Sequence, residues 1–239
     1  MFGQWRGQDG IPTLVLAGPD EFSPDAGEDA AGRLAPMTRR AYDLLRVDDG
    51  YLSAAAAAWF RDHADGAPAG FREVGDEPAT RLHHVGGRTV AVVFLPAPPK
   101  PWEDPTPAMA AQAVRAGQAA LERADLVIAV AGWGGMGERR YLAELGQAFH
   151  ILLGGGIGTG FDGVVDGAAP SLLWSRPDMQ GRSVNVVDVL AWPQRVQGRS
   201  QPRHWIVGMD ISVRQVPLKD AVEPDPVVEA VVGTVPAAR

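Results

Sequence analysis

A glycine-rich stretch, ILLGGGIGTGFDG at residues 151–163, is the first place where this sequence could do chemistry. Its apolar residues lead into a loop of glycines, and such a loop can bring backbone N–H groups close to a phosphate. Residues 158–163 also match the dinucleotide-binding pattern Gly-x-Gly-x-x-Gly. That pattern requires a helix behind it, and the following VVDGAAPSLLW does not start as one. We therefore expect either a ligand loop of another kind or the remains of a different site.

A tryptophan and an arginine add to this candidate site. Trp133 follows the apolar run 125–132, and open α/β sheets bind ligands at the carboxyl ends of their strands. Arg139, a few residues later, could meet an anion there, with a surface salt bridge as the alternative. The predicted ligand-binding residues thus combine one aromatic ring, one cation and a flexible backbone: Trp133, Arg139, Gly154, Gly155, Gly156 and Gly158.

Composition excludes several other kinds of site. The absence of cysteine removes disulfides, thiolate nucleophiles and thiolate metal ligands. A net charge of −7 with no basic stripe argues against nucleic acid as a partner. No apolar run approaches the roughly 18 residues of a transmembrane helix. Among the five histidines, no His-x-His or His-Glu-x-x-His spacing occurs, and His150 at the start of a predicted strand is expected to be structural.

The elements that would position these residues follow from the apolar pattern. Short apolar runs predict buried strands, and alanine-rich stretches between them predict helices, an order typical of an α/β protein with parallel pairing. After residue 164, partial alternation predicts antiparallel strands. Residues 20–36 and 66–87 are turn-rich and are expected to be loops, and a helix is expected near Pro226. The predicted strands are 13–18, 88–96, 125–132 and 150–155, and the predicted helices are 37–45, 51–64, 108–124 and 137–149.

The order of several phrases resembles a known family. TLVLAGPDEFSP, RTVAVVFLP, the stretch DPTPAMAAQAVRAGQAALERADLVIAV, HILLGGGIG and VPLKDAVEPDPVVEAVV resemble successive parts of the metallophosphatase (calcineurin-like phosphoesterase) domain of the 5′-nucleotidase and UDP-sugar hydrolase family. The resemblance implies a four-layer α/β/β/α sandwich with mixed sheets. It also implies one metallophosphatase-like domain over residues 1–239, without the C-terminal nucleotidase domain, and an exported, periplasmic protein. Without that resemblance, a chain lacking a signal peptide would be expected to be cytoplasmic.

The family's metal ligands are mostly missing. Its enzymes use two divalent metal ions, which need several Asp, His and Asn side chains. Where the family has Gly-Asn-His-Glu this sequence has DGYLSAAA, and where it has Gly-Gly-His-x-His this sequence has GGGIGTG. AGWGG, with Trp133, stands where the family has a Ser-His pair, and the opening Asp-x-His would precede residue 1. Asp20, in a shifted register, is the remaining candidate metal ligand.

Three functions follow as hypotheses. The first is a divergent 5′-nucleotidase-like phosphoesterase domain whose metal centre is lost or rebuilt, binding a small molecule or a protein partner at the former active-site face. The second is an active metal-dependent phosphoester hydrolase with non-standard ligands such as Asp20 or Asp162. The third is a structural subunit of a larger assembly.

Overall fold

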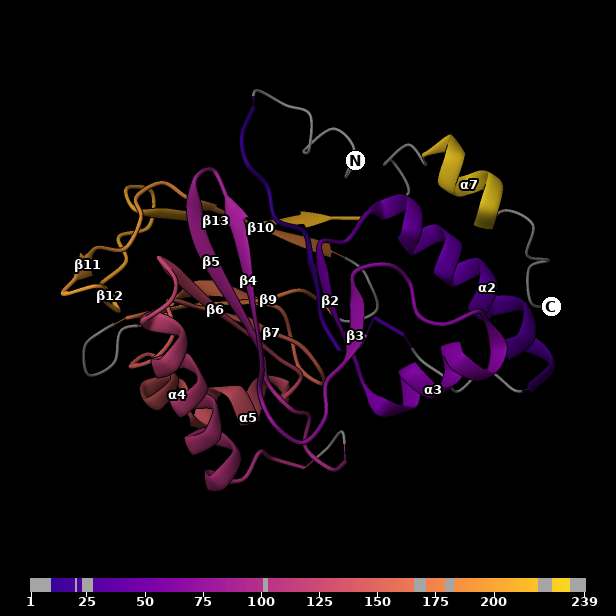
Figure 1. Ribbon diagram of the computed structural model, residues 1–239, viewed down its shortest axis with the longest axis horizontal. Coiled ribbons are helices and arrows are strands. Elements are labelled where there is room, and N and C mark those ends of the chain that lie inside the picture. Colours follow the sequence, from indigo (N-terminus) through magenta and orange to yellow (C-terminus); the bar gives the residue numbers. More distant parts are fainter. Residues whose placement is uncertain are drawn as a thin grey trace. The chain divides into compact units, whose positions relative to one another are not determined.

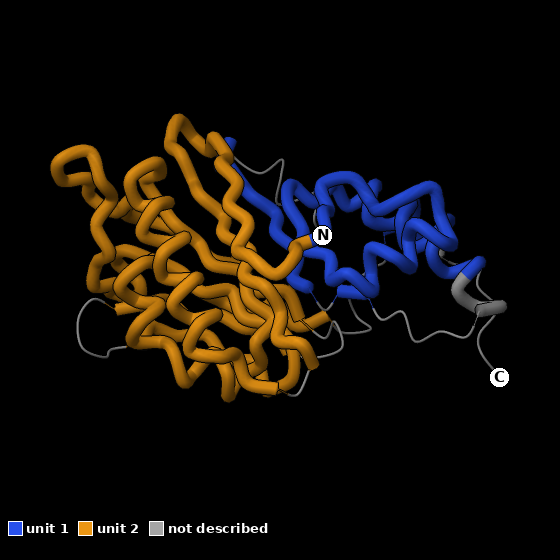
Figure 2. Tube along the Cα trace, turned by 60° about the horizontal axis from the view of Figure 1, so that its bottom comes forward, with its two compact units in different colours: residues 1–73, 219–239 blue, residues 74–218 orange. Residues whose placement is uncertain are grey.

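The computed structural model divides the chain into two compact units (Figure 2). It describes residues 10–19, 21–22, 28–100, 103–165, 171–178, 183–218 and 225–232. Unit 1 comprises residues 1–73 and 219–239, and unit 2 comprises residues 74–218. The two units are described separately below.

Unit 1 is a small parallel sheet with helices. Its strands β1 (Leu16–Ala17), β2 (Asp49–Leu52) and β3 (Phe71–Glu73) pair in that order, and its helices are α2 (Glu28–Leu45), α3 (Ala54–His63) and α7 (Pro226–Val232). The Ser53 hydroxyl accepts the Ala56 N–H and caps α3, as the sequence predicts. Edge-to-face aromatic pairs fill the core, with the Phe22 ring 4.9 Å from Phe60 and 5.1 Å from Phe71.

Unit 2 is organised around a mixed six-stranded sheet (Figure 1). The strand order is β4-β5-β6-β7-β9-β8, in which β5, β6, β7 and β9 are parallel and the two edge strands are antiparallel to their neighbours. The strand bounds are β4 Ala79–Val85, β5 Arg88–Phe94, β6 Leu126–Ala131, β7 Ile151–Gly154, β8 Phe161–Val165 and β9 Leu172–Arg176. The chain is thus an α/β protein.

Helices cover one face of this sheet and a two-stranded ribbon lies on the other (Figure 1). Helices α4 (Pro107–Leu121), α5 (Gly134–Arg140) and α6 (Leu142–Leu145) bury a cluster that includes Val127, Leu152 and Trp174. The ribbon pairs β10 (Ser183–Val189) with β13 (Ile211–Pro217), and a short hairpin of β11 (Arg195–Val196) and β12 (Arg199–Ser200) comes between them in the chain. The central strands are buried on both faces, which explains their continuous apolar sequence.

Two predicted loops are wrong. Residues 66–87 contain β3 and β4. This segment looked like a loop because β4 is an edge strand, whose residues alternate between exposed and partly buried and include polar side chains that face solvent. Helix α2 begins at Glu28, inside the segment 20–36 that was expected to be a loop, and it accommodates Pro36. The antiparallel pairing of β10 with β13 and the helix at Pro226 confirm predictions for the second half of the chain. Strand β9, expected to be antiparallel, pairs antiparallel with β8, which was not predicted, and parallel with β7. None of the described helices combines the length and apolar character needed to cross a membrane.

Candidate functional site

The carboxyl ends of β6, β7 and β9 form one edge of the unit 2 sheet, because these strands are parallel neighbours. Strand β6 leads through Trp133 into α5, and β7 leads into the glycine loop, residues 155–160. The loop and the start of α5 lie against each other, since the Gly134 N–H donates to the Gly155 carbonyl (3.1 Å) and the Gly135 N–H donates to the Ile157 carbonyl (2.8 Å). This edge is the position where open α/β sheets hold ligands.

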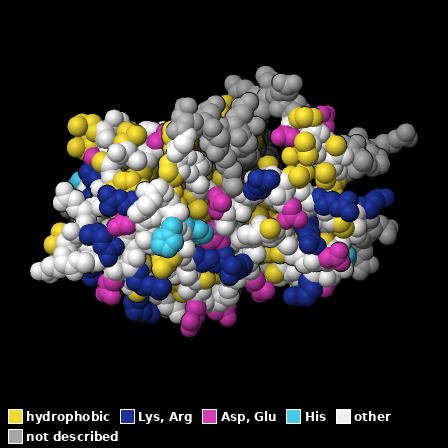
Figure 3. Space-filling model, turned by 45° about the horizontal axis from the view of Figure 1, so that its top comes forward, with side chains coloured by type: hydrophobic (Ala, Val, Ile, Leu, Met, Phe, Trp, Pro, Cys, Tyr) yellow, Lys and Arg dark blue, Asp and Glu magenta, His cyan; other side chains and the backbone are white. Residues whose placement is uncertain are grey.

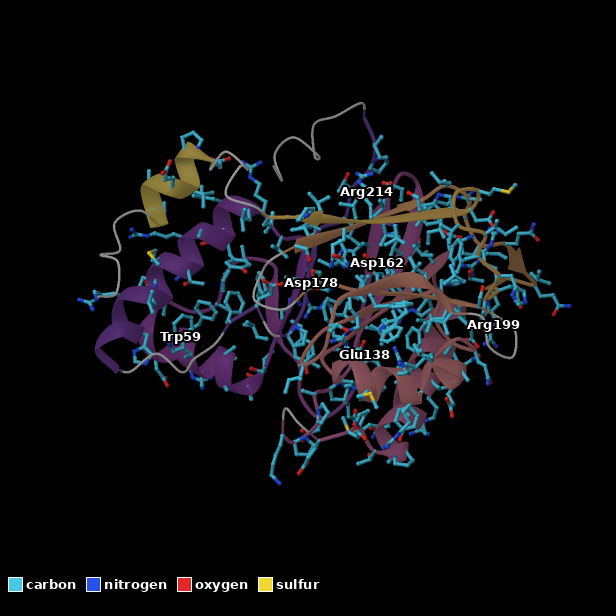
Figure 4. The ribbon with its side chains drawn as sticks, turned by 180° about the vertical axis from the view of Figure 1, so that it is seen from behind. Trp59, Glu138, Asp162, Asp178, Arg199 and Arg214 are labelled. Atoms are coloured by element: carbon cyan, nitrogen blue, oxygen red, sulfur yellow. The ribbon has the colours of Figure 1, made fainter. Side chains whose placement is uncertain are left out.

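A buried ion pair lies beneath the glycine loop. Glu138 from α5 and Arg176 from the end of β9 have side chains 0% and 1% exposed, and Glu138 Oε2 lies 2.6 Å from Arg176 Nη1. Figure 4 shows Glu138 on the helix-covered side of the sheet. The same Oε2 accepts a hydrogen bond from the Trp174 indole N–H (2.7 Å), and Oε1 accepts one from the Gly155 N–H (3.1 Å). Both carboxylate oxygens of Glu138 are therefore already in use.

The arginine also holds the loop. Arg176 Nη2 donates to the carbonyls of Gly156 (3.1 Å) and Ile157 (3.4 Å). Arg176 Nε has no hydrogen-bond partner among the described residues. Burial raises the pKa of Glu138, while the Arg176 charge and the donated hydrogen bonds oppose that rise. The charged pair consequently anchors the loop and is also costly to desolvate.

Glycine is required in the loop mainly to make room for this pair. A Cβ at Gly154 would lie 2.6 Å from Arg176 Cγ and would collide with Glu138 Oε2. At Gly158, a Cβ would lie 3.1 Å from Arg176 Nη2. Gly156 has φ +74°, a left-handed conformation that side chains rarely adopt. Packing around the buried pair thus explains glycine at positions 154 and 158, without an external phosphate.

We expect Gly154→Ala to lower the free energy of unfolding by about 1–3 kcal/mol, because its methyl group overpacks the ion pair. Urea unfolding measures the loss. Gly75→Ala is the matched control, since a Cβ there meets nothing within 4 Å, and it should leave stability unchanged or slightly raised. Equal stability of the two variants would contradict the packing explanation.

The two predicted side-chain ligands have different surroundings. Trp133 is 3% exposed, its indole N–H donates to the Pro96 carbonyl (2.8 Å), and it packs edge-to-face with Tyr141. It belongs to the core of unit 2 and does not offer a ring face to a ligand. Arg139 is exposed and its guanidinium carbon lies 5.7 Å from the centre of the Trp174 ring. The structure therefore brings Arg139 and the glycine loop to one edge and directs Trp133 away from it.

Exposed apolar side chains surround the buried pair. Met136 on α5 is 76% exposed, Ile157 in the loop is 59% exposed, and Phe161 stacks at 4.6 Å on Trp174 while remaining 37% exposed. With Arg139, they form what we call the strand-end face: Met136, Arg139, Ile157 and Phe161. A face of this composition suits a partly apolar ligand.

The residues of this edge do not fit the dinuclear metal centre that the family resemblance implies. No group of three or more His, Cys, Asp or Glu side chains that could hold a metal ion occurs among the described residues. The Glu138 oxygens are bound to Arg176, Trp174 and Gly155, and Asp178 Oδ1 accepts the Gly160 N–H of the loop (3.2 Å). The candidate ligand Asp20 lies outside the described residues.

Asp162 lies on the opposite face of the sheet (Figure 4). Its Oδ1 accepts hydrogen bonds from Ser175 Oγ (2.6 Å) and from the Asn185 side-chain amide (2.8 Å) of the ribbon. Burial is the main cause that raises the pKa of Asp162, and the Asp178 carboxylate adds to the rise. Because Ser175 and Arg176 are successive residues of β9, their side chains point to opposite faces. Asp162 thus joins the ribbon to the sheet and does not contribute to the strand-end face.

His150 occupies a structural position. His150, just before β7, is fully buried; its Nδ1 accepts the Val127 N–H (2.9 Å) and its Nε2 lies 3.1 Å from the Gln201 carbonyl. Burial lowers the pKa of His150 to about 4. His83 and His84 are successive residues of β4 and point to opposite sides, as expected if that segment is extended.

Sequence reasoning missed Glu138, Trp174 and Arg176, which form the centre of this edge. Its match to Gly-x-Gly-x-x-Gly is accidental, since β8 and not a helix follows the loop. The sequence did contain one indication of the ion pair: Arg176 ends the apolar run SLLWSR. An arginine that is buried together with such a strand needs an anionic partner.

Comparisons with known proteins assign no family. No protein-family model matches the chain, and no curated protein matches it. Among solved structures, the chain is similar to a hypothetical protein from Thermus thermophilus, with 15% sequence identity and a TM-score of 0.41. That match covers 87% of this chain and 98% of the other.

Proposed function

We propose that this protein is a divergent phosphoesterase-like domain of the 5′-nucleotidase type that binds a small molecule or a protein partner without a metal ion. The observation that carries the proposal is the buried Glu138–Arg176 pair at the edge of the parallel strands. The pair fills the strand ends where the family resemblance implies metal cations, and because its two charges neutralise each other it leaves no free charge there for a metal-like role. The four-layer sandwich of that family stays a prediction for this chain.

The strand-end face is the proposed binding surface. Its exposed apolar side chains surround a closed loop whose carbonyls already accept hydrogen bonds from the Arg176 side chain and from α5. Arg139 is the exposed cation of this face, so an apolar ligand with a negative charge suits it better than a cation. Recognition would therefore use Arg139, Met136 and Ile157, and not the loop amides that the sequence suggested.

The proposal predicts no metal-dependent hydrolysis. The purified protein, incubated with manganese, zinc or cobalt, should turn over p-nitrophenyl phosphate, bis-p-nitrophenyl phosphate and nucleoside monophosphates no faster than buffer with the same metal. Elemental analysis after dialysis should find substoichiometric metal. Robust turnover that needs the metal would overturn the proposal and favour the hydrolase with non-standard ligands, in which case Asp20→Asn and Asp162→Asn would identify the residues responsible.

A binding test should use the strand-end face itself. Thermal-shift titration with anionic aromatic compounds, such as nucleoside monophosphates, is expected to stabilise the wild type and to do so less in Arg139→Ala. Arg140→Ala is the matched control, because Arg140 is paired with Asp104 at 2.8 Å. Equal responses of both variants would argue against this face as the binding surface.

A further inference from the structure

A second exposed apolar group lies in unit 2, outside the strand-end face. Ile206, Val207 and Met209 occupy the turn just before β13 and are 54%, 56% and 71% exposed. Leu190, 55% exposed, follows β10 beside them, because its N–H donates to the Asp210 carbonyl (2.9 Å). We call this group the apolar turn: Leu190, Ile206, Val207 and Met209. Contiguous apolar exposure of this kind is unusual at a surface that has no binding role.

The apolar turn is held rigidly from below. Asp210 accepts the Ile206 N–H (3.1 Å) and pairs with Arg203 at 2.8 Å. Trp205 is buried, and its indole N–H donates to the His150 carbonyl (2.8 Å). These contacts use Asp210, Arg203 and Trp205, so the backbone of the turn does not depend on apolar side chains at 206, 207 and 209. Packing within the protein therefore gives no reason for those three residue types.

The backbone of the turn is closed on itself. The Gly208 N–H donates to the Ile211 carbonyl (2.8 Å), the Met209 N–H donates to the Ile206 carbonyl (3.1 Å), and Gly208 has φ +83°. With these groups already bonded, the turn is poorly suited to adding a strand from a partner, a mode that depends on unpaired backbone groups. Its interaction with a partner surface must come from the side chains.

Basic side chains accompany the apolar turn. Residues 190–214 contain four arginines and one carboxylate, Asp210, in a chain of net charge −7. Three of the arginines pair with Asp125, Asp188 or Asp210, whereas Arg199 has no carboxylate partner among the described residues. Figure 3 shows hydrophobic and basic side chains next to each other at the left-hand end of unit 2, which in Figure 1 carries β11 and β12. Figure 4 places Arg199 at the outer limit of that end.

From this juxtaposition we propose that the apolar turn inserts into the interface of a phospholipid bilayer with anionic headgroups. Aliphatic and thioether side chains enter the boundary between headgroups and acyl chains, while Arg199, whose charge is not paired with a carboxylate among the described residues, meets the phosphates. The proposal concerns a peripheral contact of one rigid turn, and it is independent of the function proposed for the strand-end face.

The absence of cysteine allows a direct test. Val207→Cys and Ile157→Cys are each labelled with an environment-sensitive dye and mixed with phosphatidylcholine vesicles containing about one-third phosphatidylglycerol. The two positions are similarly exposed, at 56% and 59%. Dye at position 207 should brighten and shift to the blue, and dye at position 157 should not. The response should weaken with pure phosphatidylcholine vesicles and with added salt.

Vesicle sedimentation of unlabelled protein supplies the second measurement. The variant Ile206→Ser/Val207→Ser/Met209→Ser should bind the anionic vesicles about tenfold more weakly than wild type, while Met136→Ser/Ile157→Ser binds as wild type does. Circular dichroism confirms that both variants are folded. Equal dye responses at both positions, unchanged binding of the triple variant, or a blue shift at position 207 that follows protein concentration without vesicles would each overturn the proposal. The last of these would indicate a second copy of the chain as the occupant.

Discussion

Arg176→Met is expected to lower the free energy of unfolding by about 3–5 kcal/mol, because it leaves the Glu138 carboxylate buried without its cation. Methionine fills much of the space of the arginine stem, so the loss comes mainly from charge and not from a cavity. The loop should also loosen, since the carbonyls of Gly156 and Ile157 lose their donor. Urea unfolding gives the energy, and hydrogen exchange at β9 amides assigns the loss to unit 2.

The control is the double variant Glu138→Gln/Arg176→Met. Its glutamine carbonyl can still accept a hydrogen bond from Trp174 or Gly155, but no unpaired charge remains. The double variant should therefore be more stable than Arg176→Met alone. Lys100→Met, at an exposed ion pair with Glu103, should change stability little and controls for loss of one charge. If the loss of stability in the double variant equalled the sum of the losses measured for Glu138→Gln alone and Arg176→Met alone, this account of the pair would be contradicted.

The loss of free energy of unfolding caused by Arg176→Met, called the deficit below, should also depend on pH. Burial raises the pKa of Glu138, and removing the cation removes the largest opposing influence. An acid with a raised pKa in the folded state binds more protons there than in the unfolded state, so its contribution to stability improves as pH falls. The deficit of Arg176→Met is consequently larger at pH 8 than at pH 5.

The sequence was most informative where local pattern and burial coincide. Strands β5, β6 and β7 are continuous apolar runs, and α4 is alanine-rich with the Thr106 cap and Pro107 at its start, so each can be predicted without knowing its neighbours. Strand β4 was not predicted because half of its side chains face away from the core. Its extended form is set by pairing with β5, which a single-segment pattern does not contain.

The candidate site was less predictable for a different reason. Glu138 and Arg176 are far apart in the chain, and neither stands out in its local sequence. Glu138 lies in a predicted helix beside Arg139 and Arg140, and Arg176 ends a predicted strand. Only the fold brings them within 2.6 Å. The sequence shows a glycine-rich segment after an apolar run, but it could not show that the missing side chains of Gly154 and Gly158 make room for an internal charge pair. Trp133 was predicted to contact a ligand because its local sequence does not show what binds its indole N–H. The acceptor is the Pro96 carbonyl, which follows a different strand, β5.

The stability of unit 2 is expected to fall by about 3 kcal/mol between pH 7 and pH 4 through His150 alone. The pKa of His150 is lowered from 6.5 to about 4, so the folded state binds fewer protons than the unfolded state in that range. The contribution is complete above pH 6.5 and is lost as pH falls toward 4. Its main cause is burial, which disfavours the charged ring, and the nearby Arg203 charge opposes a second positive charge there. A protonated Nδ1 also cannot accept the Val127 N–H.

Carboxylates also titrate between pH 7 and pH 4 and change the stability of every variant. The contribution of His150 is therefore measured by comparing the pH dependence of the free energy of unfolding between variants. Urea unfolding of His150→Asn, whose amide oxygen can accept the Val127 N–H, should show a shallower fall in stability between pH 7 and pH 4 than wild type. His84→Asn, at an exposed position of β4, should parallel wild type. If His150→Asn and wild type had parallel pH profiles, His150 would be protonated equally in the folded and unfolded states, and burial of the ring would not contribute to the loss of stability in acid.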